Sequence, residues 1–261
     1  MFNDPNLFAG TSGGVFLSTD SGNNWVEVNH NLTNIKVNAF AENSSYLFTG
    51  TQGGGVFLSS DNGINWDRIN DGLTSPNVYT LEISGSDIYA GTSNGIFLST
   101  NNGTNWSPIS GNSYTNIYSL IINGADIFAA TSQGVILSTD NGINWTEVNN
   151  GLTNLYVKAL VLVNSNLFAG TNDGMFISTD NGTSWNAINT GLTNTSIYCI
   201  AAKEDIIFVG TSSAVFASSD NGSNWYLSNT GLNSRATNTI ITDGDNLFLG
   251  MNYYGVYISN D

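Results

Sequence analysis

Short apolar runs separated by turn-forming residues recur along the whole chain. Residues 157–188 contain four of them, at 157–163, 167–171, 175–179 and 185–188. Gly, Asn, Asp and Ser stand between the runs, and β-branched and aromatic residues fill them, a pattern that favours strands. No stretch of about ten residues has helical periodicity. We name the four predicted strands of each unit A, B, C and D in chain order.

Tryptophan recurs in step with these runs. The spacings between successive tryptophans are 41, 40, 39, 40 and 40 residues. A period near forty residues is the signature of a repeat architecture, and four antiparallel strands per repeat, arranged radially, describe a β-propeller. The sequence therefore predicts an all-β propeller of four-stranded antiparallel blades, a single domain over residues 1–261 with six complete repeats and a truncated seventh.

The strand count favours seven blades over six. Predicted B and C strands occur seven times, whereas complete A and D strands occur only six times. Both terminal blades are then incomplete, although Met1 and Phe2 align with Val161 and Leu162 and supply a remnant of strand A. Six blades would result if the strand at 237–242 completed the first blade. Three interpretations of the ends stay open: a fragment of a longer propeller, a ring with incomplete terminal blades, or a subunit completed by another copy through strand addition.

Each tryptophan closes the same eight-residue phrase between predicted strands C and D. A carboxylate in such a tight turn accepts bonds from nearby amides, glycine takes positive φ, and a large indole packs between repeats. We predict a structural role for the acidic or amide residue, the glycine and the tryptophan of all six copies: Asp20, Gly22, Trp25, Asp61, Gly63, Trp66, Asn101, Gly103, Trp106, Asp140, Gly142, Trp145, Asp180, Gly182, Trp185, Asp220, Gly222 and Trp225.

The phrase Ser/Thr-x-Asp-x-Gly-x-x-Trp resembles the Asp box, or bacterial neuraminidase (BNR) repeat. The resemblance implies a β-propeller similar to exported bacterial repeat propellers, for which no specific activity carries over. Sialidases of this type use three arginines, whereas this chain has only Arg68 and Arg235. Xyloglucanases with Asp boxes use paired Asp residues in a cleft between two propellers, and only one propeller is predicted here.

Composition and charge limit the kinds of partner that the protein can bind. Five basic residues stand against twenty acidic ones, a net charge of −15, which disfavours nucleic acid. No run is long enough to span a membrane, and the given sequence has no signal peptide. The polar residues are mainly Asn, Ser, Thr and Gly, a composition typical of secreted bacterial repeat proteins. We therefore expect an extracellular or cell-surface location.

Catalytic and cofactor chemistry find little support in the residue pattern. His30 is the only histidine and Cys199 the only cysteine, and they fall in a loop and a distant inner strand. Successive Asp-box carboxylates stand one blade apart, too far to form a catalytic pair or share an ion. We expect no catalytic residues, no metal and no cofactor.

Departures from the repeat indicate where a ligand would bind. The B–C and D–A loops are expected on the same face, and there the chain carries Tyr114, Tyr156, Tyr253 and Tyr254. Exposed tyrosines suit sugar stacking or protein contact. The sequence thus favours a non-catalytic extracellular structural or interaction module, with a protein or carbohydrate partner and self-association through the terminal blades. The alternative is a glycan-binding or glycan-active, glycoside hydrolase-like propeller.

Overall fold

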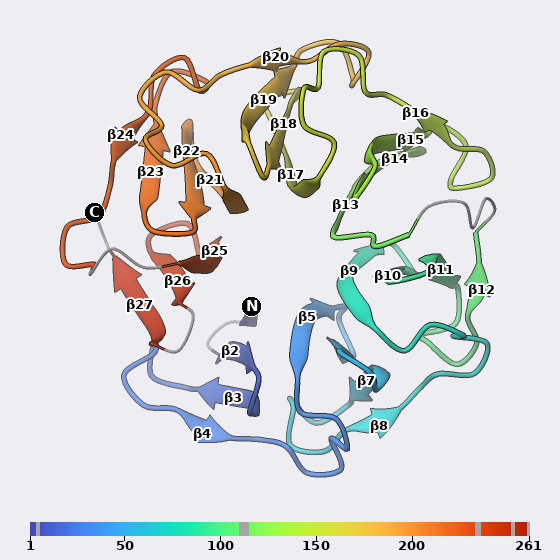
Figure 1. The fold of residues 1–261 in the computed structure, drawn as a ribbon. Coiled ribbons are helices and arrows are strands. Elements are labelled where there is room, and N and C mark those ends of the chain that lie inside the picture. The colour runs from blue at the N-terminus through green and yellow to red at the C-terminus, as the bar shows by residue number, and fades with distance from the viewer. Residues whose placement is uncertain (4–5, 110–114, 233–235, 252–253, 260–261) are drawn as a thin grey trace. The chain divides into compact units, whose positions relative to one another are not determined.

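The structure is a computed structural model in which residues 1–3, 6–109, 115–232, 236–251 and 254–259 are described. These residues form strands and turns arranged in seven antiparallel sheets, which we call blades 1 to 7 (Figure 1). Each blade is a meander in which strands consecutive in the chain are neighbours in the sheet. The prediction of four strands in the order A, B, C and D is confirmed in blades 1 to 6.

The strands have the following bounds. Blade 1 contains β1 (Phe2–Asn3), β2 (Asn6–Thr11), β3 (Gly14–Ser18) and β4 (Val26–Glu27), and blade 2 contains β5 (Val37–Glu42), β6 (Leu47–Thr51), β7 (Gly55–Ser59) and β8 (Asp67–Arg68). Blade 3 contains β9 (Val78–Ser84), β10 (Asp87–Thr92), β11 (Gly95–Ser99) and β12 (Ser107–Pro108), and blade 4 contains β13 (Ser119–Asn123), β14 (Asp126–Thr131), β15 (Gly134–Ser138) and β16 (Thr146–Glu147).

The remaining blades follow the same order. Blade 5 contains β17 (Val157–Val163), β18 (Asn166–Thr171), β19 (Gly174–Ser178) and β20 (Asn186–Ala187), and blade 6 contains β21 (Ile197–Lys203), β22 (Ile206–Thr211), β23 (Val215–Ser218) and β24 (Tyr226–Leu227). Blade 7 contains β25 (Thr237–Thr242), β26 (Leu247–Met251) and β27 (Gly255–Ser259).

The terminal blades agree with the strand count from the sequence. In β1, Phe2 pairs with Leu7, the same register in which Leu162 pairs with Leu167 in blade 5. The predicted remnant of strand A is therefore present. Blade 7 has three strands among its described residues and no D strand. Seven sheets, rather than six, are formed.

The D strands are shorter than the sequence predicts. In blade 5 the run 185–188 yields only the two-residue strand β20, which pairs with Phe176 and Ile177 of β19. Beyond it, Ile188 donates a single backbone hydrogen bond to the Met175 carbonyl, at 2.9 Å. The chain then leads toward the next blade, where the Ile188 and Thr190 carbonyls accept from the indole and amide of Trp225.

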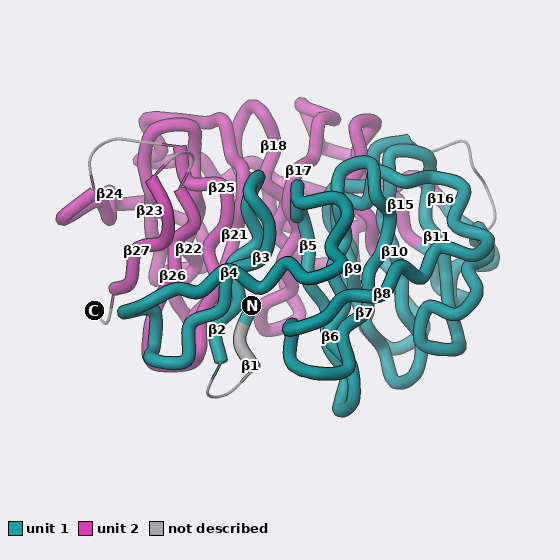
Figure 2. The backbone as a smooth tube through the Cα atoms, turned by 90° about the horizontal axis from the view of Figure 1, so that it is seen from below, with its two compact units in different colours: residues 1–127, 138–145 teal, residues 128–137, 146–261 magenta. Residues whose placement is uncertain are grey.

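Contacts divide the chain into two compact units, coloured separately in Figure 2. Unit 1 comprises residues 1–127 and 138–145, and unit 2 comprises residues 128–137 and 146–261. Blades 1 to 3 belong to unit 1 and blades 5 to 7 to unit 2, while blade 4 is divided between the two. Each unit is described below by itself.

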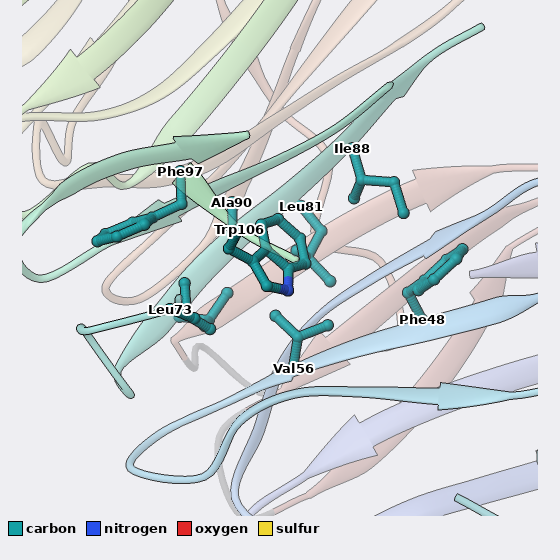
Figure 3. Packing of buried hydrophobic residues seen from close by; sticks show 9 residues of the cluster. Phe48, Val56, Leu73, Leu81, Ile88, Ala90, Phe97 and Trp106 are labelled. Atoms are coloured by element: carbon teal, nitrogen blue, oxygen red, sulfur yellow. The ribbon is translucent and has the colours of Figure 1, made fainter. Parts of the chain in front are cut away.

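The hydrophobic core of each unit lies between successive blades. In unit 1, one cluster joins Phe48 and Val56 of blade 2 to Leu81 and Phe97 of blade 3, with Trp106 beside them (Figure 3). Unit 2 has an equivalent cluster between blades 5 and 6. Strands B and C are buried on both faces by these contacts, which is why their sequences are apolar without strict alternation.

Candidate functional site

The eight-residue turns between strands C and D, which we call the C–D turns, are built on one hydrogen-bond pattern. In the first, Ser18 Oγ donates to Asp20 Oδ1 at 2.8 Å and accepts from the Gly22 amide at 2.8 Å. The Asn24 amide donates to the same carboxylate oxygen at 2.8 Å. The glycines of all six turns have positive φ, 88° at Gly22 for example. Each turn therefore satisfies its own backbone by side-chain bonds.

The third turn keeps this pattern without a carboxylate. Asn101 Oδ1 accepts from Ser99 Oγ at 3.0 Å and from the Asn105 amide at 2.9 Å. Only the outer contact changes direction, because the Asn101 amide now donates to Asn105 Oδ1. An acceptor oxygen, rather than a negative charge, is what the turn geometry uses.

Hydrogen bonding also sets the ionisation of the turn carboxylates. The side chain and then the backbone amide of Asn24 lower the pKa of Asp20, and Asn65 does the same for Asp61. The same kind of bonds lower the pKa of Asp140, Asp180 and Asp220. These groups are held ionised as acceptors, unlike a general acid, whose pKa must be raised.

Four tryptophans connect their turn to the preceding blade with two hydrogen bonds each. In unit 1, the Trp66 indole N–H donates to the Val28 carbonyl at 2.9 Å, and the Trp66 amide donates to the His30 carbonyl at 3.0 Å. Trp106, Trp185 and Trp225 make the same two bonds. Each indole N–H donates to a carbonyl 37 residues earlier in the chain, and each amide donates to a second carbonyl of the preceding blade. All four side chains are buried. We call these four residues the bridging tryptophans.

The other two tryptophans bond within their own turn. Trp25 donates its indole N–H to the Gly22 carbonyl at 3.1 Å, and Trp145 donates to the Gly142 carbonyl at 3.0 Å. Both are only partly buried. The sequence places all six tryptophans in one class, whereas the structure separates them into two.

A second repeated contact escaped the sequence analysis. Four residues after Trp25, Asn29 Oδ1 accepts from the Val15 amide at 2.7 Å, and its Nδ2 donates to the Gly13 carbonyl at 3.2 Å. An asparagine at the same distance from the tryptophan accepts the corresponding bond in blades 2, 4, 5 and 6: Asn70, Asn149, Asn189 and Asn229. Its spacing of four residues after five of the six tryptophans was the available signal, with Ser110 at that position after Trp106.

His30 and Cys199 occupy separate parts of the fold. His30 is exposed in the loop after β4, where its Nδ1 contacts Asn65 Oδ1. Cys199 lies in β21, where burial raises the pKa of its thiol to about 12 and its Sγ contacts the Thr237 carbonyl at 3.5 Å. Such a thiol is protonated at neutral pH and is a poor nucleophile. Among the described residues, no three His, Cys, Asp or Glu side chains gather as metal ligands.

Tyr156, one of the predicted tyrosines, lies where a B–C turn meets a D–A loop. The Asn172 amide of a B–C turn donates to the Tyr156 carbonyl at 3.2 Å, and the Gly174 amide donates to the Thr195 carbonyl at 2.7 Å. Tyr156 is 36% exposed and Tyr254 is 49% exposed. Tyr114 and Tyr253 lie outside the described residues. We call the surface of unit 2 formed by residues 154–158, 172–173 and 194–198 the loop face.

A β-bulge near the start of the A strand in blades 2, 3, 5, 6 and 7 adds residues that the sequence analysis missed. The register shifts between Val157 and Ala159, which leaves Lys158 as the extra residue, and between Ile197 and Cys199, which leaves Tyr198. Equivalent bulges occur in blades 2, 3 and 7 at Asn38, Tyr79 and Asn238. Bulges redirect side chains and are frequent next to functional sites.

Several bulge residues contact the following blade. In unit 1, Asn38 Nδ2 donates to the Val78 carbonyl at 2.8 Å, and the Tyr79 and Tyr118 rings have centroids 5.5 Å apart. In unit 2, Lys158 Nζ lies 4.0 Å from the centroid of the Tyr198 ring and 5.8 Å from that of Tyr156. Desolvation by burial lowers the pKa of Lys158. We call Tyr156, Lys158 and Tyr198 the lysine–tyrosine cluster.

Comparison with known proteins identifies the fold. The model of the DUF6242 beta propeller domain matches residues 29–150 and, in an overlapping match, 77–194, together more than half of the 261-residue chain. The chain belongs to this β-propeller family, and the predicted fold class, an all-β propeller with seven blades, is confirmed. No curated protein matches the sequence. No helix in the described residues has the length and hydropathy needed to cross a membrane.

Solved structures share the fold at low sequence identity. The extracellular domain of the putative hybrid two component system BT3049 from B. thetaiotaomicron has a TM-score of 0.83 and 16% identity, over 99% of this chain and 38% of that one. YCF48 bound to D1 peptide has a TM-score of 0.78 and 15% identity, over 97% and 88% of the two chains. The GH74 xyloglucanase from Xanthomonas campestris has a TM-score of 0.77 and 13% identity, over 98% and 50%.

The chain is much shorter than several of these proteins. It spans 36% of the similar BT4673 extracellular domain and half of the xyloglucanase. At these identities the similarity establishes the fold alone. The neighbours include extracellular domains, a propeller with a bound peptide and glycoside hydrolases, so the fold accommodates both binding and catalysis.

Proposed function

We propose that this chain is a non-catalytic extracellular binding module, an Asp-box propeller whose loop face in unit 2 contacts the ligand. The observation that carries the proposal is the lysine–tyrosine cluster, in which a partly buried ammonium lies over the Tyr198 ring beside the exposed Tyr156. Aromatic rings and a cation at one site are typical of recognition surfaces. The C–D turns, repeated in six blades, serve the scaffold.

The state of the ionisable groups supports binding over catalysis. The carboxylates of the C–D turns are engaged by hydrogen bonds in their own turns, with lowered pKa values. Glycoside hydrolysis needs two carboxyl groups flanking one bond, one of them with a raised pKa. Desolvation raises the pKa of the Glu82 carboxyl to about 7. At the corresponding position of strand A, however, blades 2 and 4 to 7 carry apolar residues rather than a second carboxyl group: Ala41, Ile121, Val161, Ala201 and Ile241.

Similar proteins supply additional support. Extracellular domains of putative sensor systems share the fold over nearly all of this chain, and YCF48 was solved with a bound peptide. These facts concern those proteins, but they fit an extracellular recognition role for this one.

A binding screen tests the proposal. The wild-type chain and the Tyr198→Leu variant are compared on immobilised glycans and peptides, with Tyr226→Leu as control. Tyr226 is 50% exposed on the D strand β24, away from the loop face. We expect Tyr198→Leu to weaken binding at least about tenfold and Tyr226→Leu to leave it unchanged. Equal binding by all three proteins would contradict the proposal, and release of reducing sugar from a bound glycan would favour the glycan-active alternative.

Self-association is a second candidate function, favoured by the edge of blade 7. β27 is the outermost described strand of its sheet, and its Ile258 is 46% exposed, whereas the corresponding strand β7 of blade 2 is mostly buried. An apolar strand at the edge of a sheet can pair with a strand of another copy. If copies associate there, light scattering on a sizing column will show assemblies that disappear in Ile258→Lys. A species of one chain's mass at all concentrations would exclude this candidate.

A further inference from the structure

The loop face gives the lysine–tyrosine cluster a defined shape. The turn at 172–173 lies between the segments that begin β17 and β21, because the Asn172 amide bonds the Tyr156 carbonyl and the Gly174 amide bonds the Thr195 carbonyl. The bulges of β17 and β21 then place Lys158 and Tyr198 side by side, with the ammonium 4.0 Å from the ring centroid. Aromatic surface, a cation and a polar turn are thus brought together.

The Lys158 ammonium lacks an anionic partner among the described residues. No carboxylate of that part of the chain forms an ion pair with it, and its resolved contacts are the two tyrosine rings. By contrast, Arg68 donates to the Gly54 carbonyl and Lys203 to the Asp245 carbonyl. A ring face attracts the charge of an ammonium, but its three N–H groups still need acceptors. In a chain of net charge −15, this cation without a counter-ion is a ready partner for one anionic group of a ligand.

The surroundings favour a ring-shaped ligand with hydroxyl groups. Leu155 is 44% exposed and precedes Tyr156 in the chain, so apolar surface continues beyond the cluster. The Asp173 carboxylate accepts from Thr195 Oγ1 at 3.2 Å and has acceptor capacity left for a hydroxyl donor. Asp173 also disfavours a ligand with closely spaced negative charges at this end of the site. The arrangement suits a pyranose with one carboxylate.

We infer that the lysine–tyrosine cluster binds a hexuronate residue of an acidic glycan. The sugar carboxylate pairs with Lys158, the apolar face of the ring packs on the tyrosines, and a sugar hydroxyl donates to Asp173. This inference rests on the proposed binding function and names the ligand class for the same site. A peptide carboxylate would pair with Lys158 equally well, but the carboxylate alone would leave the exposed apolar side chain of Leu155 and the ring of Tyr156 unused.

Paired ligands that differ only in charge test the inference. Binding of galacturonate and mannuronate oligomers of four residues is measured by calorimetry and compared with their fully methyl-esterified forms. A charge-assisted bond to a partly desolvated ammonium should make at least one acid bind about 10- to 100-fold more tightly than its ester. Equal affinities of acid and ester, both lost in Tyr198→Leu, would overturn the hexuronate assignment and leave the proposed binding function standing.

Variants at the lysine show whether the preference comes from this site. Lys158→Met should abolish the difference between acid and ester, and Lys158→Arg should keep most of it. Lys203→Met removes one positive charge elsewhere and should change neither affinity. Thermal unfolding of each variant checks that it is folded. If no sugar binds at millimolar concentration while a peptide with a free C-terminal carboxylate binds and is lost in Lys158→Met, the ligand is a peptide and the hexuronate assignment is wrong.

Discussion

The C–D turns of blades 1 to 6 and the beginnings of the A strands both recur along the chain, yet they use polar groups in opposite ways. In the turns, Asp20 accepts bonds from Ser18 and Asn24, and hydrogen bonds lower its pKa. In the A strands, desolvation raises the pKa of Glu82 to about 7, and Thr237 Oγ1 is buried without a partner. The turns are held by hydrogen bonds among their own side chains and backbone, whereas the A strands hold a desolvated carboxyl group and, among the described residues, one buried hydroxyl without a partner.

This difference suggests how the repeat divides its tasks. A turn that satisfies its own backbone can be copied six times with little change, and Asn101 shows that even the charge is dispensable for its geometry. The bulge positions instead change from blade to blade, from Asn38 to Tyr79 to Lys158. Natural sequences accept local costs at functional sites. Substitutions in the turns should therefore lower stability, and some substitutions in the A strands should raise it.

The largest expected effect is the loss of a bridging tryptophan. Trp66→Ala removes a buried indole from the contact between blades 1 and 2 and leaves the Val28 carbonyl without its donor. We expect a loss of about 3–5 kcal/mol in the free energy of unfolding. Trp25→Ala, at a partly buried indole bonded within its own turn, should cost clearly less. Equal urea midpoints for the two variants would show that the hydrogen bond between blades adds no stability beyond that of a tryptophan bonded within its own turn.

The next effect is a gain of stability that depends on pH. The Glu82 pKa is raised from 4.5 to about 7 in the folded chain, so its protonated form is favoured there. Below about pH 4.5 the Glu82 carboxyl is protonated in both the folded and unfolded chain, so its pKa shift does not affect the free energy of unfolding. As pH rises the folded state loses stability, and the loss is complete above about pH 7. Glu82→Gln should therefore match the wild type at pH 4 and exceed it at pH 8 by at most about 3 kcal/mol.

Urea unfolding at the two pH values measures this difference. Glu27→Gln, in the exposed strand β4, is the control for removing one negative charge from an acidic chain. An equal gain at pH 8 in both variants would mean that the effect comes from net charge rather than from the burial of Glu82.

The elements that bury apolar side chains could be predicted closely from the sequence. In blade 5, strands B and C begin within a residue of the predicted positions, β18 at Asn166 and β19 at Gly174. The glycine of the turn that follows each C strand of blades 1 to 6 has the predicted positive φ, 84° at Gly182 for example. The D strands were predicted too long: in blade 5 only Asn186 and Ala187 pair in the sheet, and the Ile188 carbonyl accepts from the Trp225 indole of the next blade. Such contacts leave no local pattern in the sequence.

The candidate site was only partly predictable for a related reason. Tyr156 stood out as a departure from the repeat, but Lys158 and Tyr198 did not, because a bulge depends on the register between two strands. The available signal was one position in each repeat that follows a Val, Ile or Thr and precedes a small residue. That position holds Asn38, Tyr79, Tyr118, Lys158, Tyr198 and Asn238. A large polar side chain that recurs between two small or β-branched residues indicates a bulge at that position.

A smaller gain of stability is expected from the unpaired hydroxyl of Thr237. The corresponding residue of the other A strands is Val or Ile: Val37, Val78, Ile117, Val157 and Ile197. Thr237→Val fills the same space without a buried polar atom and should raise the free energy of unfolding by about 1–2 kcal/mol. Val157→Thr should lower it by a similar amount. An unchanged urea midpoint in Thr237→Val would mean that the hydroxyl has a partner in solution.

The smallest effect should come from removing the charge of a C–D turn while keeping its acceptor. In Asp220→Asn the new Oδ1 can still accept from Ser218 Oγ and the Asn224 amide, as Asn101 does in the third turn. The Asp220 pKa is lowered in the folded chain, so its charge contributes stability above the ordinary Asp pKa of 3.8, and this is lost as pH falls through the folded pKa. The variant should therefore be slightly less stable than the wild type at pH 7 and indistinguishable from it in strong acid. Asp220→Ala removes the acceptor as well and should be less stable than Asp220→Asn at every pH. If the two variants unfold at the same urea concentration, the turn depends on the charge rather than on the acceptor, and the geometry of Asn101 must then be maintained by its neighbours.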